Sequence, residues 1–403
     1  MKKLSLEEVL LSIKSINKEF RFIIMFSRVL VLLFGLLLLT GCQSKDDLTL
    51  VFVGSFTDKK SGEGIHVYEF NTRTGESTLK FTLDSVINTS FLKLSPNGKY
   101  LYSVVESQMN YNGKVASFEI DIINQKIDLI NTQDCGGRNP AHIEIDKGGI
   151  FLINSNYSDP SLSVFKINKN GSLNPYSQVL RFKDSSIVES RQSEAHIHSS
   201  NFSPDNKYLF AQDLGADKIR GFEFKDEASN IILQNENQIK IKPGSGPRHF
   251  TFHPNGKFGY SISELSGKVA LFNYHKGKLG FIEDYLSNKQ KQEVYRAADI
   301  HISPDGKFLY ASNRGPKEDS ISIFSINQDN GKLSLVGHEP AYGEHPRNFA
   351  ISPDGKFLLV ANQFSNNIVV FKRNDKSGKL YRLPNEIKVN SPSSIQMRTY
   401  NIN

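Results

Sequence analysis

The chain is poor in cysteine, with only Cys42 and Cys135 among its 403 residues. Two cysteines cannot build the disulfide framework that stabilises many small secreted domains, so that class of fold is excluded. Cys42 belongs to a targeting signal described below. Cys135 stands alone, and a lone cysteine is typical of a small buried side chain rather than of a nucleophile.

Long runs of basic residues are also missing. The formal net charge is +7, and residues 1–41 supply three of these charges, which leaves +4 for the rest of the chain. Without a basic stripe interleaved with aromatic residues, a nucleic-acid interface is not expected. The 28 phenylalanines, 15 tyrosines and 29 glycines instead favour a globular, β-rich protein.

The apolar run near the N-terminus is short. Residues 29–40 read VLVLLFGLLLLT, whereas a membrane-spanning helix needs about 20 apolar residues. A run of this length is typical of a signal-peptide core. It leads directly into Leu39-Thr40-Gly41-Cys42, which resembles the lipobox of bacterial lipoproteins, where cleavage leaves an acylated cysteine as the new N-terminus.

We therefore predict a signal peptide over residues 1–41, with Met25 as a second candidate start. Cys42 is the predicted lipidated residue, and residues 42–47 form a polar tether to the folded part. These features place the protein in the cell envelope as a membrane-anchored lipoprotein, in the periplasm or on the outer surface.

From residue 91 onward one pattern recurs six times: an apolar strand, a Ser-Pro-Asp-Gly-Lys type turn, a second apolar strand and a third strand. Examples are FLKLSPNGKYLYSVVE from residue 91 and DIHISPDGKFLYASNR from residue 299. Pro-Asp-Gly between β-rich runs is hairpin chemistry. Four antiparallel strands about every fifty residues make one propeller blade. The equivalent turn positions, separated by 51, 57, 50, 50 and 49 residues, are Ser95, Asp146, Ser203, His253, Ser303 and Ser352.

Two incomplete pieces at the ends complement each other. Residues 48–56 and 64–70 resemble the outer strands of a blade, and residues 391–397 resemble an inner strand. We therefore predict an all-β, seven-bladed β-propeller over residues 48–403, its ring closed by N-terminal and C-terminal strands in one shared blade. A closed ring has no open edge and needs no partner, so a monomer is expected.

The repeat register identifies one rim of the central channel, because the start of an inner strand and the end of its antiparallel neighbour lie at the same rim. The twelve positions differ in residue type between blades, which is expected where a ligand breaks the symmetry. They are the strand starts Ser90, Ala141, His198, Arg248, Ala298 and Arg347 and the strand ends Glu106, Tyr157, Leu214, Glu264, Arg314 and Gln363. Around them lie His142, Asn156, His196, Asp213 and His249.

Some of these residues also allow purely structural interpretations. Glu264 with Arg248 or Arg314 can form an inter-blade ion pair. His196 and His198 have a spacing that suits metal ligation. No clear third ligand accompanies them, so we predict neither a metal nor a cofactor.

Eight motifs, taken together, resemble those of one known family. They are Val53–Phe56 (VGSF), Asn139–His142 (NPAH), His196–His198 (HIH), Asp213–Lys218 (DLGADK), Gly246–Phe250 (GPRHF), Ser263–Leu265 (SEL), Ser312–Gly315 (SNRG) and Pro346–Phe349 (PRNF). In them the chain resembles the lactonase, or cycloisomerase-2, family of seven-bladed propellers, which includes a propeller-type 6-phosphogluconolactonase and a fungal carboxy-muconate cyclase.

The resemblance implies that a His, two Arg and a Glu carry the chemistry, at His198, Arg248, Glu264 and Arg314. A lactone is a cyclic ester, so its hydrolysis needs a proton acceptor for water and donors for the oxyanion. Glu264 or His198 is the candidate base. Arg248 and Arg314 would stabilise negative charge or bind a substrate phosphate or carboxylate.

The partner implied by these residues is a small-molecule lactone or sugar acid, and export favours an unphosphorylated one. Two alternatives stay open: a non-catalytic propeller that binds a ligand or protein at the rim, and a cycloisomerase that closes a lactone from a muconate-like diacid. The predicted substrate contacts are Glu106, His142, Asn156, His196, Asp213, His249, Arg347 and Gln363.

Overall fold

The computed structural model describes residues 6–7, 10–11, 47–225 and 232–402. Its main compact unit is Leu48–Tyr400, and a second unit contains Met1–Asp47 with Asn401–Asn403. Cys42 and nearly all of the predicted signal segment lie outside the described residues. No helix within the described ranges is long and apolar enough to cross a membrane.

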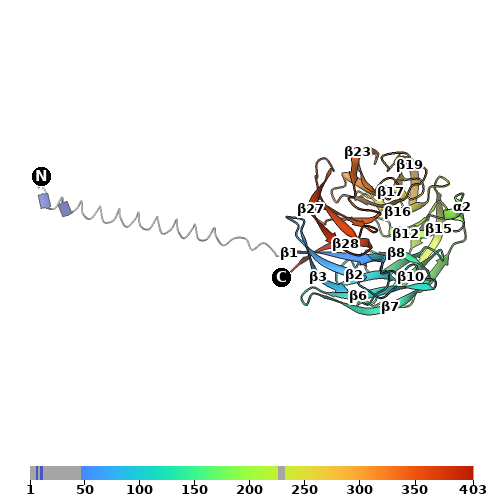
Figure 1. Ribbon diagram of the computed structural model, residues 1–403, viewed down its shortest axis with the longest axis horizontal. Helices are drawn as coiled ribbons and strands as arrows, with labels where there is room; N and C mark the ends of the chain where they lie inside the picture. The colour runs from blue at the N-terminus through green and yellow to red at the C-terminus, as the bar shows by residue number, and fades with distance from the viewer. Residues whose placement is uncertain (1–5, 8–9, 12–46, 226–231, 403) are drawn as a thin grey trace, which may run out of the picture. The chain divides into compact units, whose positions relative to one another are not determined.

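The main unit consists of seven four-stranded antiparallel sheets, arranged around a central axis (Figure 1). The seven-bladed propeller is confirmed. From inner to outer strand, the six sheets continuous in sequence are β4(Phe91–Leu94), β5(Tyr100–Val105), β6(Asn112–Asp121) and β7(Lys126–Arg138); β8(Pro140–Ile145), β9(Phe151–Asn156), β10(Ser161–Lys166) and β11(Gln178–Arg181); β12(Ile197–Phe202), β13(Tyr208–Asp213), β14(Lys218–Phe224) and β15(Leu233–Lys240); β16(Pro247–Phe252), β17(Phe258–Ser263), β18(Lys268–His275) and β19(Lys278–Leu286); β20(Ala297–Ile302), β21(Phe308–Asn313), β22(Ser320–Ile326) and β23(Leu333–Pro340); and β24(Pro346–Ile351), β25(Phe357–Asn362), β26(Asn367–Arg373) and β27(Leu380–Lys388).

The seventh sheet joins the two ends of the propeller sequence, as predicted. Its inner strand is the C-terminal β28(Pro392–Asn401), followed outward by β1(Asp47–Ser55), β2(Ile65–Phe70) and β3(Ser77–Leu83). In Figure 1 the red β28 lies beside the blue β1 and β2. The Ser393 hydroxyl donates to the carbonyls of Gly54 and Ser90, both at 3.2 Å. It thereby links β28 to β1 in the same blade and to the segment before β4 in the next one.

The repeated turn between the first two strands has a physical basis in its side chains. In β24–β25 the Ser352 hydroxyl donates to Asp354 at 2.6 Å and accepts from the backbone N–H of Phe357 at 2.9 Å. Gly355 has a φ of 72°, which a residue with a Cβ rarely adopts. The Ser-Pro-Asp-Gly pattern therefore encodes a hairpin that sets the strand register.

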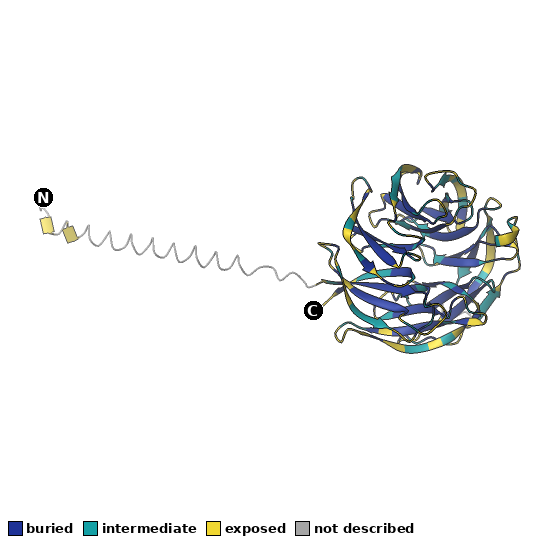
Figure 2. Ribbon diagram, in the orientation of Figure 1, coloured by how far each residue is buried: buried dark blue, intermediate teal, exposed yellow. Residues whose placement is uncertain are grey.

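The core lies between neighbouring blades, whose strands form the dark blue interior in Figure 2. One cluster, for example, joins Ile153 and Leu162 of one blade to Leu209 and Phe222 of the next. Buried tyrosines add hydrogen bonds between blades, such as that from the Tyr310 hydroxyl to the carbonyl of Gly378 at 2.8 Å. The packing therefore fixes each blade against the next.

One backbone hydrogen bond recurs in all seven blades and defines the rim. The residue that follows the second strand donates its N–H to a carbonyl just before the inner strand, as Glu264 does to Gly246 at 2.7 Å. The donors in chain order are Phe56, Glu106, Tyr157, Leu214, Glu264, Arg314 and Gln363. The register predicted from the repeat is therefore the register of the fold, and Phe56 is its seventh member.

Candidate active site

A small pocket of about 160 Å³ opens at this rim. Eight of the twelve predicted rim residues line it, and the other four lining residues come from the segments beside them. The lining residues are Ser90, Ser107, Gln108, Asn139, Ala141, Tyr157, Arg191, His198, Arg248, Glu264, Arg314 and Arg347.

A shift in strand pairing directs several of these side chains into the pocket. In the β16–β17 pair, Pro247 pairs with Ser263 and His249 with Ile262, so Arg248 is an extra residue without a partner. The same bulge-like shift occurs at Ala141, His198 and Arg347. Such bulges re-aim side chains and are common next to active sites. The strand starts therefore line the pocket because the ladder is interrupted there.

Glu264 is the centre of a buried ion cluster. Its Oε1 accepts from Arg191 Nη2 at 2.7 Å, and its Oε2 accepts from Arg248 Nε at 3.0 Å and Arg314 Nη2 at 2.9 Å. Glu264, Arg248 and Arg314 are buried, and the Arg191 side chain is 36% exposed. The carboxylate thus binds guanidinium groups from three different parts of the ring.

The cluster keeps Glu264 ionised. Burial alone would raise the pKa of this carboxyl, but Arg314, Arg248 and Arg191 together hold its pKa well below the usual value. Burial, and then the charges of Arg314 and Arg347, lower the pKa of Arg248. Because an arginine side chain remains protonated in proteins, the cluster is an anion among cations.

His198 lies in the same pocket. Its Nδ1 is buried and unpaired within the part of the chain that the structure describes. Its ring stands edge-on to those of Tyr157 and His249, with centroids 5.7 and 5.2 Å away. Burial first, and then the charge of Arg248, hold the pKa of His198 well below its ordinary value, so the ring is neutral at pH 7.

His249 and His142 lie in the channel beside this pocket. Arg248 Nη1 donates to His249 Nε2 at 3.3 Å, and His249 Nδ1 donates to Asp299 at 2.7 Å. Burial, followed by the charge of Arg248, lowers the pKa of His249 to about 4. The His142 ring centroid is 5.7 Å from that of His249. His249 thus holds the Arg248 guanidinium, and His142 packs against His249.

Arg314 and Arg347 complete the positive side of the pocket. Arg314 Nη1 donates to Nε2 of His345 at 3.1 Å, which requires the neutral form of this imidazole. Arg347 lies over the ring of Phe56, 5.2 Å from its centroid. Burial and Arg314 lower the pKa of Arg347 to about 10, so it too is charged at neutral pH.

The family model described as "Lactonase, 7-bladed beta-propeller" matches residues 50–397. The chain belongs to this lactonase family. It is 62% identical over 351 residues to the 6-phosphogluconolactonase of Formosa agariphila, covering 87% of this chain and 99% of that one. The predicted family resemblance is thereby confirmed.

Solved structures agree with this assignment. A candidate 6-phosphogluconolactonase from Bacteroides fragilis has a TM-score of 0.83 and 37% identity, covering 88% of this chain and 99% of its own. The periplasmic gluconolactonase of Pseudomonas aeruginosa has a TM-score of 0.82 and 33% identity, with coverage of 87% and 99%.

Four predicted contact residues of this lactonase-family protein have other partners. Glu106 pairs with Lys114 at 2.6 Å. Asn156 is fully buried and donates to the carbonyl of Cys135 at 2.9 Å. Asp213 binds Arg220 and is fully buried. The His196 ring stacks on Tyr157, with centroids 4.2 Å apart, and so supports a pocket wall.

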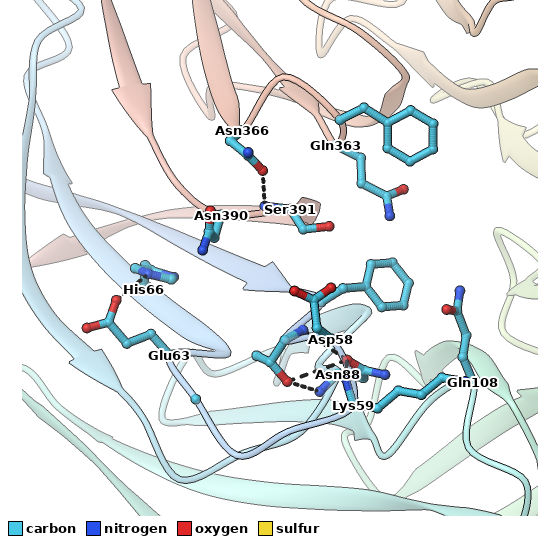
Figure 3. Close-up of a pocket in the computed structure, with 14 residues that line it drawn as sticks. Asp58, Lys59, Glu63, His66, Asn88, Gln108, Gln363, Asn366, Asn390 and Ser391 are labelled. Carbon is cyan, nitrogen blue, oxygen red and sulfur yellow. Dashed lines mark hydrogen bonds and ion pairs between the residues drawn. The ribbon is translucent and has the colours of Figure 1, made fainter.

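Gln363 lines a second, larger cavity on the same rim, shown in Figure 3. Gln108 lines both cavities. The eight predicted contact residues thus divide into Arg347 in the pocket, Gln363 in the neighbouring cavity, two channel histidines and four residues bound elsewhere.

Sequence reasoning missed Arg191, the third guanidinium on Glu264. It lies in the short helix α2(Glu189–Gln192), within the connection from β11 to β12. One signal was present, because the turn spacing across this blade is 57 residues where the others are 49–51. The additional residues of this connection place Arg191 over the channel mouth.

Two other kinds of site were considered from the sequence, namely a metal site and a nucleophilic cysteine. The described residues include no group of three or more His, Cys, Asp or Glu side chains placed to hold a metal. Cys135 is a buried, free cysteine, and burial raises the pKa of its thiol to about 12. A thiol in that environment is a poor nucleophile.

Proposed function

We propose that this lactonase-family protein hydrolyses a sugar lactone to the corresponding hydroxy acid, with His198, Arg248, Glu264 and Arg314 as its catalytic residues. The observation that carries the proposal is the joint placement of a triply clamped Glu264 and an unpartnered, neutral His198 in one pocket.

Hydrolysis of a lactone requires protein groups that act on its carbonyl and on its ring oxygen. Water attacks the carbonyl carbon and loses a proton to a base, and the carbonyl oxygen becomes an oxyanion. The ring C–O bond then breaks, and the ring oxygen takes the proton held by the base to become an alcohol. The carboxylic acid formed at the other end releases its proton to solvent and becomes a carboxylate. Arg248 and Arg314 are buried donors whose positions are fixed by their hydrogen bonds, which is the arrangement that stabilises an oxyanion best.

Of the two candidate bases, His198 suits the role better. The Glu264 oxygens already accept three charge-assisted hydrogen bonds, and its lowered pKa makes it a weak proton acceptor. His198 lines the pocket, and its Nδ1 has no hydrogen-bond partner among the residues that the structure describes. The guanidinium field disfavours its protonation, but a developing oxyanion offsets that field at the moment of attack.

The charge of the pocket favours an anionic product. Four guanidiniums, of Arg191, Arg248, Arg314 and Arg347, face the single carboxylate of Glu264. This excess suits the carboxylate formed by ring opening, or a phosphate carried by the substrate. The names of the relatives, a 6-phosphogluconolactonase and a periplasmic gluconolactonase, support a sugar lactone of either kind.

A pH-stat assay on glucono-1,5-lactone tests the proposal after subtraction of spontaneous hydrolysis. We expect His198→Gln to lower kcat/KM at least about 100-fold, the usual lower bound for a general base. His275→Gln, at an exposed position on β18, is the matched control. Equal turnover by His198→Gln and the control would refute the assignment of His198. Ligand binding without turnover by any form would support the non-catalytic alternative.

We also propose that the protein is exported and anchored through an acylated Cys42, and that its propeller is monomeric. The lipobox-like motif and the periplasmic location named for the Pseudomonas relative support export. Labelled palmitate should enter the parent but not Cys42→Ser, and the variant should leave the membrane fraction. Light scattering of the solubilised protein should give the monomer mass.

A further inference from the structure

The larger cavity beside the catalytic pocket has the size of a ligand site. It measures about 860 Å³, within the roughly 300–1,000 Å³ range of small-molecule sites. The catalytic pocket, at about 160 Å³, lies below that range. Segments from both ends of the propeller sequence form the larger cavity, including Asp58 and Lys59 after β1 and Asn390 before β28.

The two cavities adjoin each other at the rim. Gln108 lines both, and in Figure 3 its side chain and that of Gln363 point toward the same open space. Phe56 lines the larger cavity and carries on its face the guanidinium of Arg347, which lines the smaller one. The larger cavity therefore lies within reach of a substituent on a lactone that is bound in the catalytic pocket.

The two cavities differ in charge. The larger one has Lys59 as its cation and Asp58 and Glu63 as its anions. Burial lowers the pKa of His66, an effect that Glu63 partly offsets, so this imidazole is neutral at pH 7. An anionic group thus has no favourable place here, in contrast to the arginine-rich pocket.

The walls offer hydrogen bonds of both kinds. The lining includes five carboxamides, a group that carries both donors and acceptors, as does a sugar hydroxyl. The lining amides are Asn88, Gln108, Gln363, Asn366 and Asn390. Asn88 and Asn366 already use amide atoms to hold the cavity wall, so the amides of Gln108, Gln363 and Asn390 are the ones that face a ligand. Oε1 of Gln363 and Nδ1 of His66 are buried without a hydrogen-bond partner in the described part of the chain. Phe56 and Phe364 add apolar surface, and Phe364 is 59% exposed.

The backbone of this cavity is held in unusual conformations. Of the fifteen described non-glycine residues with positive φ, six line the cavity, namely Asp58, Lys59, Asn88, Gln108, Asn366 and Ser391. Such conformations cost about 1–3 kcal/mol each and cluster at ligand clamps.

Side-chain hydrogen bonds fix these segments against one another. Asn88 accepts from the N–H of Thr57 at 2.9 Å and donates to the carbonyl of Ser107 at 2.8 Å, and Asn366 accepts from Ser391 N–H at 2.8 Å. The walls of the cavity are therefore pre-organised before a ligand binds.

We propose that this cavity binds an uncharged glycosyl unit linked to the lactone ring, so that the preferred substrate class is the lactone of a disaccharide-derived aldonic acid. The inference rests on the lactonase function proposed above and extends it. The arginine pocket takes the ring that opens, and the amide-lined cavity takes the neutral sugar beyond it.

Kinetics with two substrates test the subsite. The parent should have a kcat/KM at least tenfold higher for lactobionolactone than for glucono-1,5-lactone. Asn390→Trp, which fills the cavity from an exposed position, should abolish this difference through KM and leave the glucono-1,5-lactone rate within twofold. Lys307→Trp, on an exposed turn in another blade, is the matched control and should behave as the parent.

Binding of the ring-opened acids separates the two proposals, because it needs no turnover. By calorimetry the parent should bind lactobionate at least tenfold more tightly than gluconate, and Asn390→Trp should bind both equally. Equal affinities in the parent would overturn the subsite, even if glucono-1,5-lactone is hydrolysed. A retained affinity difference without hydrolysis of any lactone would uphold the subsite and refute the lactonase function.

Discussion

Arg191 donates a hydrogen bond of 2.7 Å to Glu264, which lies 73 residues later in the chain and in a different blade. The guanidinium reaches the carboxylate from helix α2, outside the repeat, whereas Arg248 and Arg314 reach it from repeat positions. A residue of an irregular connection thus completes a cluster that the repeat begins. The seven blades share one architecture, but this ion cluster therefore depends on one irregular connection between two of them.

Removing Arg191 should weaken catalysis more than folding. Arg191→Ala deletes one charge-assisted hydrogen bond to Glu264, a contact of the kind that contributes about 1.5–3 kcal/mol. We expect kcat/KM on the best lactone to fall about 10- to 100-fold, with a small change in Tm because the side chain is partly exposed. Arg138→Ala, which breaks an exposed pair with Asp159, is the control. An unchanged kcat/KM would contradict a role for Arg191.

The pH profile should report a base with a lowered pKa. The base proposed above, His198, can accept a proton only when it is neutral. Burial together with the Arg248 charge holds its pKa below the ordinary value of about 6.5. The plateau of kcat/KM should therefore extend well below pH 6.5, with a decline only in more acidic solution. Rates measured from pH 4 to 8 check this. A midpoint at or above 6.5 would contradict the neutral, buried state of His198.

Replacing Glu264 by Gln should destabilise the fold strongly. Arg248 and Arg314 would remain buried without their counter-charge, and breaking such a pair costs about 3–5 kcal/mol. Chemical denaturation monitored by circular dichroism measures the change. Glu69→Gln removes the half-exposed partner of Lys80 and should cost no more than about 1 kcal/mol. Similar losses for the two variants would be inconsistent with the ion cluster.

Acid should destabilise the parent through the same carboxyl. The folded-state pKa of Glu264 is lowered, so its stabilising contribution is complete above the unfolded value of about 4.3 and is lost as pH falls toward the folded pKa. Between pH 5 and pH 3 the free energy of unfolding should therefore fall more steeply for the parent than for Glu264→Gln. Parallel curves would show that Glu264 titrates normally in the folded protein.

Deleting β28 should prevent folding of the ring. This strand is the inner member of the shared blade, and the N–H of Ile395 donates to Asn348 of the neighbouring blade at 2.7 Å. A chain that ends at residue 391 should lose its cooperative thermal transition and aggregate through the exposed edge of β1. A chain lacking only residues 402–403 should melt as the parent does.

Much of the architecture was predictable because each blade repeats the same local chemistry. The Ser352–Asp354 turn has counterparts at Ser203 and Ser303, and these hairpins set the register without reference to the rest of the ring. The same register placed His198, Arg248, Glu264 and Arg314 at one rim, where the structure brings them together in one pocket.

Other parts of the site depend on contacts that leave no periodic signal. Asn156 and Asp213 end their strands near the rim, but their side chains are satisfied by Cys135 and Arg220 inside the blades. Arg248 is itself the unpaired residue near the start of β16, and this break in strand pairing sets its orientation. The alternation of apolar and polar residues does not reveal such a break. The large cavity arises only where the two ends of the propeller meet.

Local turn chemistry and strand alternation were enough to predict the repeat, its hairpin turns, the blade shared by the two ends and the rim on which the charged residues lie. Tertiary contacts bring Arg191 to Glu264 beside Arg248 and Arg314, and they leave His198 Nδ1 without a partner among the described residues. They also form a cavity without an excess of cations next to the arginine pocket. Burial and long-range electrostatics set these features, and both depend on which distant segments the closed ring brings into contact.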